Sequence, residues 1–177
     1  MASDGPRPDW LIDGLQARQE SDLMRALGIF RAARAQYPHD PRTHYWFAVT
    51  SDNLGFEAVA IPAYEAALSL GVDAWPEAEA YLASSLLKTW RADIALPHIL
   101  RALDSEPHNA LFHVIAGDVQ AGLGNLEAAE RHFQRAPLLD PQLGLAWHRL
   151  GQWLGRQGVL DGAEEALLRS WELGFRG

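Results

Sequence analysis

The seven histidines are the side chains of this 177-residue sequence best suited to metal or proton chemistry. Zinc sites on helices commonly use two histidines four residues apart, often within a His-Glu-x-x-His motif. No two histidines here stand four residues apart, and that motif is missing from the sequence. We therefore expect no metal site and no cofactor, and we interpret the histidines as partly buried aromatic side chains.

Two pairs of carboxylates and one glycine pair are the other candidates for chemistry. Glu164-Glu165 and Glu77-x-Glu79 would need an enclosed pocket and perturbed pKa values to act as general acids or bases. The sequence shows neither. Gly122-x-Gly124 lacks the third glycine of a dinucleotide-binding loop and follows no predicted strand. These patterns predict a protein that is not an enzyme.

The amino-acid composition argues against several classes of partner and site. The sequence has 23 acidic residues against 15 Lys and Arg, a formal net charge of −8. That balance argues against nucleic acid, because phosphate binding needs a basic face. Cysteine is missing, so disulfides and thiolate metal sites are excluded. No apolar segment approaches the roughly 20 residues that span a bilayer, and no export signal is visible, so we expect a cytoplasmic protein without a membrane partner.

The elements that position these side chains follow an internal repeat. Repeat starts at 7, 41, 76, 110 and 144 align the sequence with itself at steps of 34 or 35 residues. The twentieth residue of each repeat is alanine, and the eighth is always Gly or Ala. Small residues at fixed places let two helices approach closely. This pattern predicts two antiparallel helices per repeat, at 8–20 with 23–36, 42–54 with 57–70, 77–89 with 92–105, 111–122 with 126–138, and 145–156 with 160–173.

Prolines and one tryptophan depart from an ideal pattern. Pro62 and Pro97 fall early in second helices, where they predict a late start or a kink. Pro137 is expected to shorten or bend the second helix of the fourth repeat. Trp90 stands where the other hairpins favour glycine in the turn between helices, as at Gly124.

The repeat resembles the tetratricopeptide repeat (TPR), with its W-x2-L-G-x2-Y, A-x3-F, A and P signature. The fifth copy has Trp147-x2-Leu150-Gly151, and the fourth has Ala129-x3-Phe133 followed by Pro141. The chain is similar to bacterial TPR repeat-containing proteins, and the single Lys beside abundant Ala and Gly also indicates a bacterial source. The resemblance implies an all-α fold, a right-handed α-α superhelix (solenoid) of about five helical hairpins. It implies one domain over 7–177 after a flexible tail at 1–6, divided into repeats 7–40, 41–75, 76–109, 110–143 and 144–177.

In the TPR family the first helix of each pair lines a concave surface that binds partners. Carried over by repeat position, the resemblance implies a partner-binding set of Leu11, Leu15, Arg18, Arg42, Tyr45, Trp46, Val49, Asp52, Ser84, Lys88, Val114, Asp118, His148 and Gln152. Its N-terminal part is an apolar strip that is expected to be exposed, and exposed apolar surface commonly marks a binding site. The alternative is that these side chains pack against neighbouring helices.

The C-terminal hairpin carries a second set of apolar residues, Trp153, Leu168, Trp171 and Phe175. Terminal repeats need a polar outer side for solubility. Three explanations stay open: the tail folds back as a cap, two chains associate as a homodimer through this hairpin, or the sequence is a fragment.

Taken together, the sequence predicts a non-catalytic scaffold that binds a peptide or partner protein on its concave face. The alternative is a regulatory or substrate-positioning TPR segment of a larger enzyme or assembly.

Overall fold

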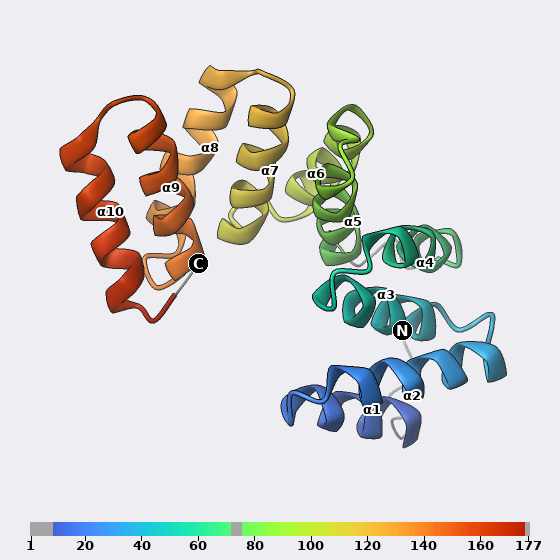
Figure 1. Ribbon diagram of the computed structural model, residues 1–177. Helices are drawn as coiled ribbons and strands as arrows, with labels where there is room; N and C mark the ends of the chain where they lie inside the picture. The colour runs from blue at the N-terminus through green and yellow to red at the C-terminus, as the bar shows by residue number, and fades with distance from the viewer. Residues whose placement is uncertain (1–8, 72–75, 176–177) are drawn as a thin grey trace. The chain divides into compact units, whose positions relative to one another are not determined.

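The computed structural model describes residues 9–71 and 76–175, and these contain ten α-helices and no strand (Figure 1). The helices are α1 (Asp9–Gln19), α2 (Leu23–Gln36), α3 (Pro41–Asn53), α4 (Glu57–Ser69), α5 (Pro76–Lys88), α6 (Ala92–Ser105), α7 (Ala110–Gly122), α8 (Leu126–Leu139), α9 (Gly144–Arg156) and α10 (Leu160–Glu172). Each helix begins and ends within one residue of the span that the repeat pattern predicts. The prediction of an all-α fold is confirmed. The expected tail at 1–6 lies outside the described residues.

The three internal prolines do not shift the ends of their helices, and the alternative expectation of a kink or bend at each stays a prediction. α4 and α6 begin at the predicted residues and run through Pro62 and Pro97, so the expected late start is wrong. α8 contains Pro137 and continues to Leu139, so the expected shortening is wrong as well. Each proline removes one backbone hydrogen-bond donor. The remaining backbone hydrogen bonds are enough to keep a helix of 13 or 14 residues continuous.

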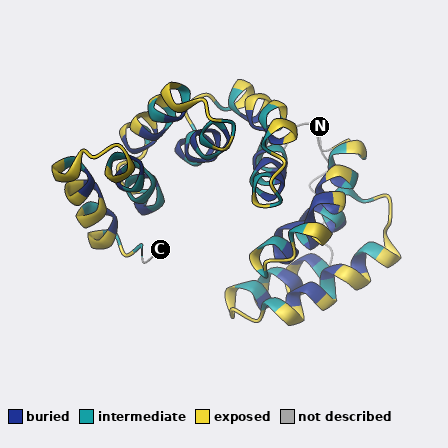
Figure 2. Cartoon of the chain, turned by 45° about the horizontal axis from the view of Figure 1, so that its top comes forward, coloured by how far each residue is buried: buried dark blue, intermediate teal, exposed yellow. Residues whose placement is uncertain are grey.

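The chain divides into two compact units, Met1–Ser85 (unit 1) and Leu86–Gly177 (unit 2), and α5 crosses the division. Within unit 1, α2 packs against α1 and α3, and α3 packs against α4. Within unit 2, α7 packs against α6 and α8, and α9 packs against α8 and α10. Buried residues lie on the sides of the helices that face their neighbours (Figure 2). The single domain over 7–177 and its repeat boundaries stay a prediction.

Alternating small and large residues build the core of each hairpin. The recurring alanine is buried in every repeat, with Ala26, Ala60, Ala95 and Ala129 fully inaccessible to solvent. Phe30 and Phe133 fill the space beside it and lie directly against the glycine of the facing helix. This arrangement lets the two helices of a hairpin approach closely.

The turns inside the hairpins share one geometry. The fifteenth residue of each repeat has a positive φ, 77° at Gly55, 78° at Gly124 and 79° at Gly158. The following residue donates a backbone hydrogen bond five residues back, as Asn125 does to Gln120 at 2.9 Å. This is the Schellman ending of a helix, which favours glycine. Ser21 and Trp90 take the same conformation, at 61° and 63°, without being glycine.

A ring N–H ties some first helices to the preceding repeat. Trp147 Nε1 donates to the carbonyl oxygen of Pro141 at 3.0 Å, and His113 Nε2 lies 3.1 Å from that of Pro107. The equivalent distance from His44 Nε2 to the Pro38 oxygen is 2.9 Å. Histidine thus replaces tryptophan at this repeat position because both rings offer an N–H in the same place.

Candidate binding surface

The apolar strip expected in unit 1 is more buried than its sequence suggests. Leu11, Tyr45 and Val49 each expose less than a tenth of their surface, whereas Leu15 and Trp46 are half-buried. The expectation of an exposed apolar strip is therefore wrong for the first three, which pack within the unit. Trp46 stacks on Phe30 with ring centres 6.1 Å apart.

Arg18 is the charged group at the centre of this surface. Its Nη1 donates to Thr50 Oγ1 at 3.0 Å, and its guanidinium carbon lies 5.7 Å from the centre of the Trp46 ring. The Thr50 hydroxyl itself donates to the Trp46 carbonyl oxygen at 2.8 Å, so its lone pair is directed to Arg18. Among the residues that the structure describes, no carboxylate forms an ion pair with Arg18. The half-buried guanidinium of Arg18 therefore contacts only neutral groups among the described residues, the Thr50 hydroxyl and the Trp46 ring.

Three tyrosines affect the pKa of the Arg18 guanidinium. Burial lowers this pKa, and the nearby Tyr64, Tyr45 and Tyr81 raise it. Burial in turn raises the pKa of each tyrosine, so all three hydroxyls stay protonated at neutral pH. The surroundings of Arg18 are therefore neutral and partly aromatic, which leaves its positive charge uncompensated.

The other unit 1 residues of the predicted set do not gather at Arg18. Arg42 is held at the start of α3 by Asp40, with Nη2 2.6 Å from Oδ2, and that carboxylate also caps the helix. Asp52 and Ser84 are half-buried. Lys88 is exposed on α5, past the division between the units.

Unit 2 contains five residues of the predicted set, Lys88, Val114, Asp118, His148 and Gln152, and the structure brings two of them together through Arg149. Asp118 on α7 pairs with Arg149 on α9, whose Nε lies 3.1 Å from Oδ2, and Arg149 Nη1 donates to Gln152 Oε1 at 3.0 Å. Burial raises the pKa of Asp118, against the opposing effect of Arg149. Val114 is buried in a cluster with Ala136 and Ala146. It is therefore part of the core.

A small cavity lies beside this ion pair. Its volume is about 30 Å³, its wall is mostly polar, and residues of α7, α8 and α9 line it. The lining residues are Asp118, Phe133, Arg149, Gln152, Trp153 and Arg156. Arg149 and Arg156 were not predicted from the sequence, because neither stands at a repeat position that lines the concave surface in the family.

Known structures resemble this chain over most of its length, although no sequence model of a protein family and no curated protein matches it. TTC0263, a thermophilic TPR protein of Thermus thermophilus, aligns over 93% of this chain and 90% of its own, with a TM-score of 0.80 and 23% identity. The chain has the TPR fold. MamA of Desulfovibrio magneticus RS-1, from residue 41 to its end, aligns over 93% of both chains, with a TM-score of 0.75 and 22% identity. YrrB, also a TPR protein, aligns over 93% and 84%, with a TM-score of 0.66 and 19% identity.

The TPR hairpin in the fourth repeat holds a histidine pair that sequence reasoning missed. His113 on α7 and His132 on α8 have their Nδ1 atoms 2.9 Å apart. Because His113 Nε2 faces the Pro107 carbonyl, its proton is on Nε2, and the proton between the rings belongs to His132. Burial lowers the pKa of both imidazoles. In the described ranges no group of three or more His, Asp or Glu is arranged to hold a metal ion.

The C-terminal TPR hairpin separates the four residues expected to mediate self-association. Trp153 is 5% exposed and packs on Phe133, with ring centres 5.4 Å apart. Phe175 is half-buried and packs against His148, with ring centres 5.0 Å apart. Leu168 and Trp171 remain on the outside of α10, 55% and 62% exposed. Only the last two offer an outward apolar surface.

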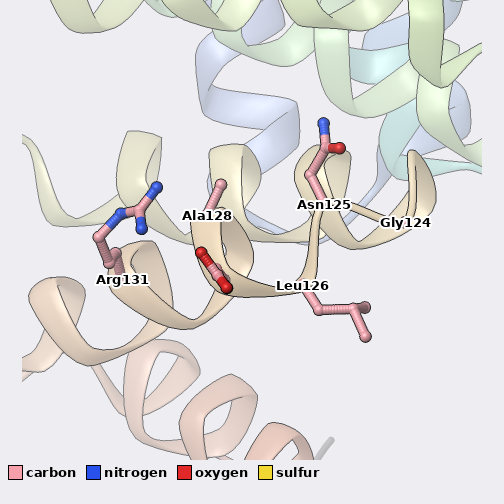
Figure 3. Close-up of a pocket in the computed structure, with 6 residues that line it drawn as sticks. Gly124, Asn125, Leu126, Ala128 and Arg131 are labelled. Atoms are coloured by element: carbon pink, nitrogen blue, oxygen red, sulfur yellow. The ribbon is translucent and has the colours of Figure 1, made fainter.

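An open hollow of about 550 Å³ lies at the start of α8 (Figure 3). Gly124, Asn125, Leu126 and Arg131 line it, and the side chains of Leu126 and Arg131 diverge there. Its side chains do not converge on a common point, so it lacks the arrangement of a ligand site. Over residues 9–71 and 76–175, no helix is both long and apolar enough to cross a bilayer.

Proposed function

We propose that this chain is a non-catalytic protein-interaction module, which binds a peptide segment of a partner on the concave surface lined by α1 and α3. The observation that carries the proposal is Arg18. Its positive charge is half-buried beside Trp46 and has neutral partners among the described residues. A desolvated charge without a counter-ion is costly, and a partner that supplies an acceptor removes that cost.

The chemistry around Arg18 favours a peptide as the ligand. Arginine and tryptophan are residues on which binding energy at protein interfaces concentrates. The Arg18 fork offers further N–H donors to backbone carbonyls or carboxylates, while Trp46 offers an apolar face. YrrB, which shares the fold, is described as a TPR protein with an unusual peptide-binding site.

A peptide selection tests this proposal. A random 12-residue library displayed on phage is selected against the full chain, and the dissociation constants of enriched peptides are measured by calorimetry. We expect Arg18→Gln to weaken binding by at least tenfold, because a hydrogen bond to a charged group contributes about 1.5–3 kcal/mol. The matched control is Arg31→Gln, which removes an exposed arginine from α2 and should leave the affinity unchanged. Equal affinities for all three proteins would reject the proposed surface.

We also propose that the C-terminal hairpin supports a homodimer through Leu168 and Trp171. Both are exposed on α10, beside a hollow of about 420 Å³ that Trp147 and Leu168 line. Light scattering over a range of concentrations tests this with Trp171→Glu. We expect a concentration-dependent dimer that the variant loses and that Leu138→Glu, a change at an exposed leucine of α8, retains. A wild-type protein that is monomeric at every concentration would rule it out.

A further inference from the structure

The second helix of the last hairpin exposes a side that other second helices bury. Positions 17, 21, 24 and 28 of the repeat form one stripe, since they follow the three- and four-residue spacing of a single helix face. In α2, α6 and α8, which pack against α3, α7 and α9, this stripe has twelve residues, and all except Leu126 are buried or half-buried. In α10 all four residues of the stripe are exposed: Leu160, Glu164, Leu167 and Trp171.

Position 24 shows what covers the stripe of an inner hairpin. Phe133 on α8 is 3% exposed, and Trp153 of the next first helix packs on its ring with centres 5.4 Å apart. Phe30 on α2 is fully buried, and Trp46 of the next first helix stacks on its ring at 6.1 Å. Leu167 holds the same position in α10 and is 39% exposed. The α10 stripe therefore continues the surface through which successive hairpins pack.

The chemistry of the α10 stripe fits such packing. Leu160 is 71% exposed and Trp171 is 62% exposed, and exposed apolar residues gathered on one helix face commonly mark an interaction site. Glu164 is its one charged residue. Glu130 occupies the same position in α8 and is half-buried where α8 packs against α9, so contact between hairpins accommodates a carboxylate there.

The first helix of the chain does not offer a matching surface. First helices meet the preceding hairpin through positions 3, 7 and 10 of the repeat, as Ala146 meets Ala136. In α3, α7 and α9, eight of the nine residues at these positions are buried and the ninth is half-buried. α1 instead has Asp9, Asp13 and Gln16 there, and both aspartates are exposed. A head-to-tail stack of two copies would bury these carboxylates against an apolar stripe, which is unfavourable.

We propose that the α10 stripe of one copy packs on the α10 stripe of a second copy, with the two helices antiparallel about a two-fold axis. This inference rests on the proposed homodimer of the C-terminal hairpin, and it gives that dimer a contact surface and an orientation. An antiparallel pair centred on the stripe brings Leu160 of each copy opposite Trp171 of the other. The two end hairpins then cover each other as successive hairpins do within the chain. The contact is closed, because both copies use the same surface.

Single-cysteine variants test the orientation, because the chain has no cysteine of its own. Glu164→Cys places a thiol near the middle of the stripe, and Asp13→Cys places one on α1; both replace exposed carboxylates, so the core is untouched. With a short bis-maleimide cross-linker, we expect Glu164→Cys to form covalent dimers with itself. We expect no cross-link between Asp13→Cys and a size-tagged Glu164→Cys protein. Glu127→Cys, at an exposed residue of α8, measures the background from random collision.

Two leucines of equal exposure test the contact surface. Leu160 lies on the stripe and is 71% exposed, whereas Leu138 lies on α8 and is 73% exposed. We expect Leu160→Ser to raise the dimer dissociation constant at least tenfold in sedimentation equilibrium, because each dimer buries this leucine twice. Leu138→Ser should leave the constant within twofold of wild type. Circular dichroism of both variants confirms that the helices are intact.

The outcomes separate this inference from the homodimer on which it rests. A dimer that Trp171→Glu dissociates, but that cross-links Asp13→Cys to Glu164→Cys or keeps its affinity in Leu160→Ser, would preserve the homodimer and overturn the antiparallel pairing. A wild-type protein that is monomeric at every concentration would overturn both, and the stripe would then belong to a different partner.

Discussion

Gly117 on α7 lies so close to Phe133 on α8 that a Cβ atom on the glycine would come 2.6 Å from Cε1 of the ring. No real Cβ tolerates that approach, so the phenylalanine or the helix would have to shift. We expect Gly117→Ala to lower the free energy of unfolding by about 1–3 kcal/mol through overpacking. Urea denaturation measures the change.

Gly28 supplies the matched control. It lies in α2, and no atom outside its own helix turn comes within 4 Å of the place that an added methyl group would take. Gly28→Ala should therefore raise the free energy of unfolding by about 0.5–1 kcal/mol, because alanine favours the helix more than glycine does. If both substitutions change stability in the same direction, the close packing of the hairpins is not what fixes glycine at position 117.

The backbone conformation of Trp90 leads to a second prediction about stability. It has a φ of 63° at a turn position where three other repeats have glycine, and its side chain is 95% exposed. A left-handed backbone conformation costs a non-glycine residue about 1–2 kcal/mol. Glycine avoids this cost, but it loses more conformational entropy on folding, which offsets part of the gain. We expect Trp90→Gly to raise the thermal midpoint and the free energy of unfolding by about 0.5–1 kcal/mol.

Gly124→Ala, the opposite change at the equivalent turn of the fourth repeat, is the control for Trp90→Gly. Gly124 has a φ of 78° and no atom near its missing side chain, so Gly124→Ala introduces backbone strain without a clash. It should lower the stability by about 1 kcal/mol. A Trp90→Gly variant less stable than wild type would show that the indole makes contacts that outweigh the strain.

The pair of His113 and His132 predicts a dependence on pH. Burial lowers the pKa of both imidazoles below the ordinary value of 6.5, and the charges of Arg131 and Arg135 act in the same direction. His108 also disfavours the charged form of His113. Well above pH 6.5 both rings are neutral in the folded and the unfolded chain, so the full stability is present. As the pH falls below 6.5, the unfolded chain binds protons first and the stability decreases.

A double substitution isolates this contribution. His113→Trp with His132→Ala reproduces the residues at the same positions of the last repeat, Trp147 and Ala166, and keeps a ring N–H for the Pro107 carbonyl. We expect it to lose less stability than wild type between pH 7.5 and 5.5 in urea denaturation, whereas His39→Gln, an exposed histidine, should behave as wild type. An unchanged slope with pH in the double variant would contradict the assignment.

The sequence period predicts the helices well because each repeat must nest against the next. Alanine recurs where two helices touch, and that recurrence places every helix end to within one residue. The repeat period does not predict which side chains on the expected binding surface are buried. Leu11 and Tyr45 are buried because neighbouring helices cover them, which depends on packing rather than on repeat position.

The groups that carry the chemistry of the site were harder to predict. Arg149 and Trp153 stand outside the repeat positions that line the concave surface in TPR proteins, and they meet Asp118 only because α9 packs near α7. His113 and His132 are nineteen residues apart, a spacing with no helical meaning, and the hairpin alone brings their rings together. Contacts between helices of this kind have no signature in one sequence.

The most direct test of the proposed binding surface is the set of tryptophan indole N–H signals in the NMR spectrum when a selected peptide is added to the full chain. Trp46, whose ring lies beside the Arg18 guanidinium, reports on the surface of α1 and α3, and Trp171 reports on the outside of α10. We predict that the Trp46 signal shifts in proportion to peptide occupancy, that the Trp171 signal does not, and that Arg18→Gln abolishes the shift at the same peptide concentration. A peptide that binds while the Trp46 signal stays unmoved would contradict the account.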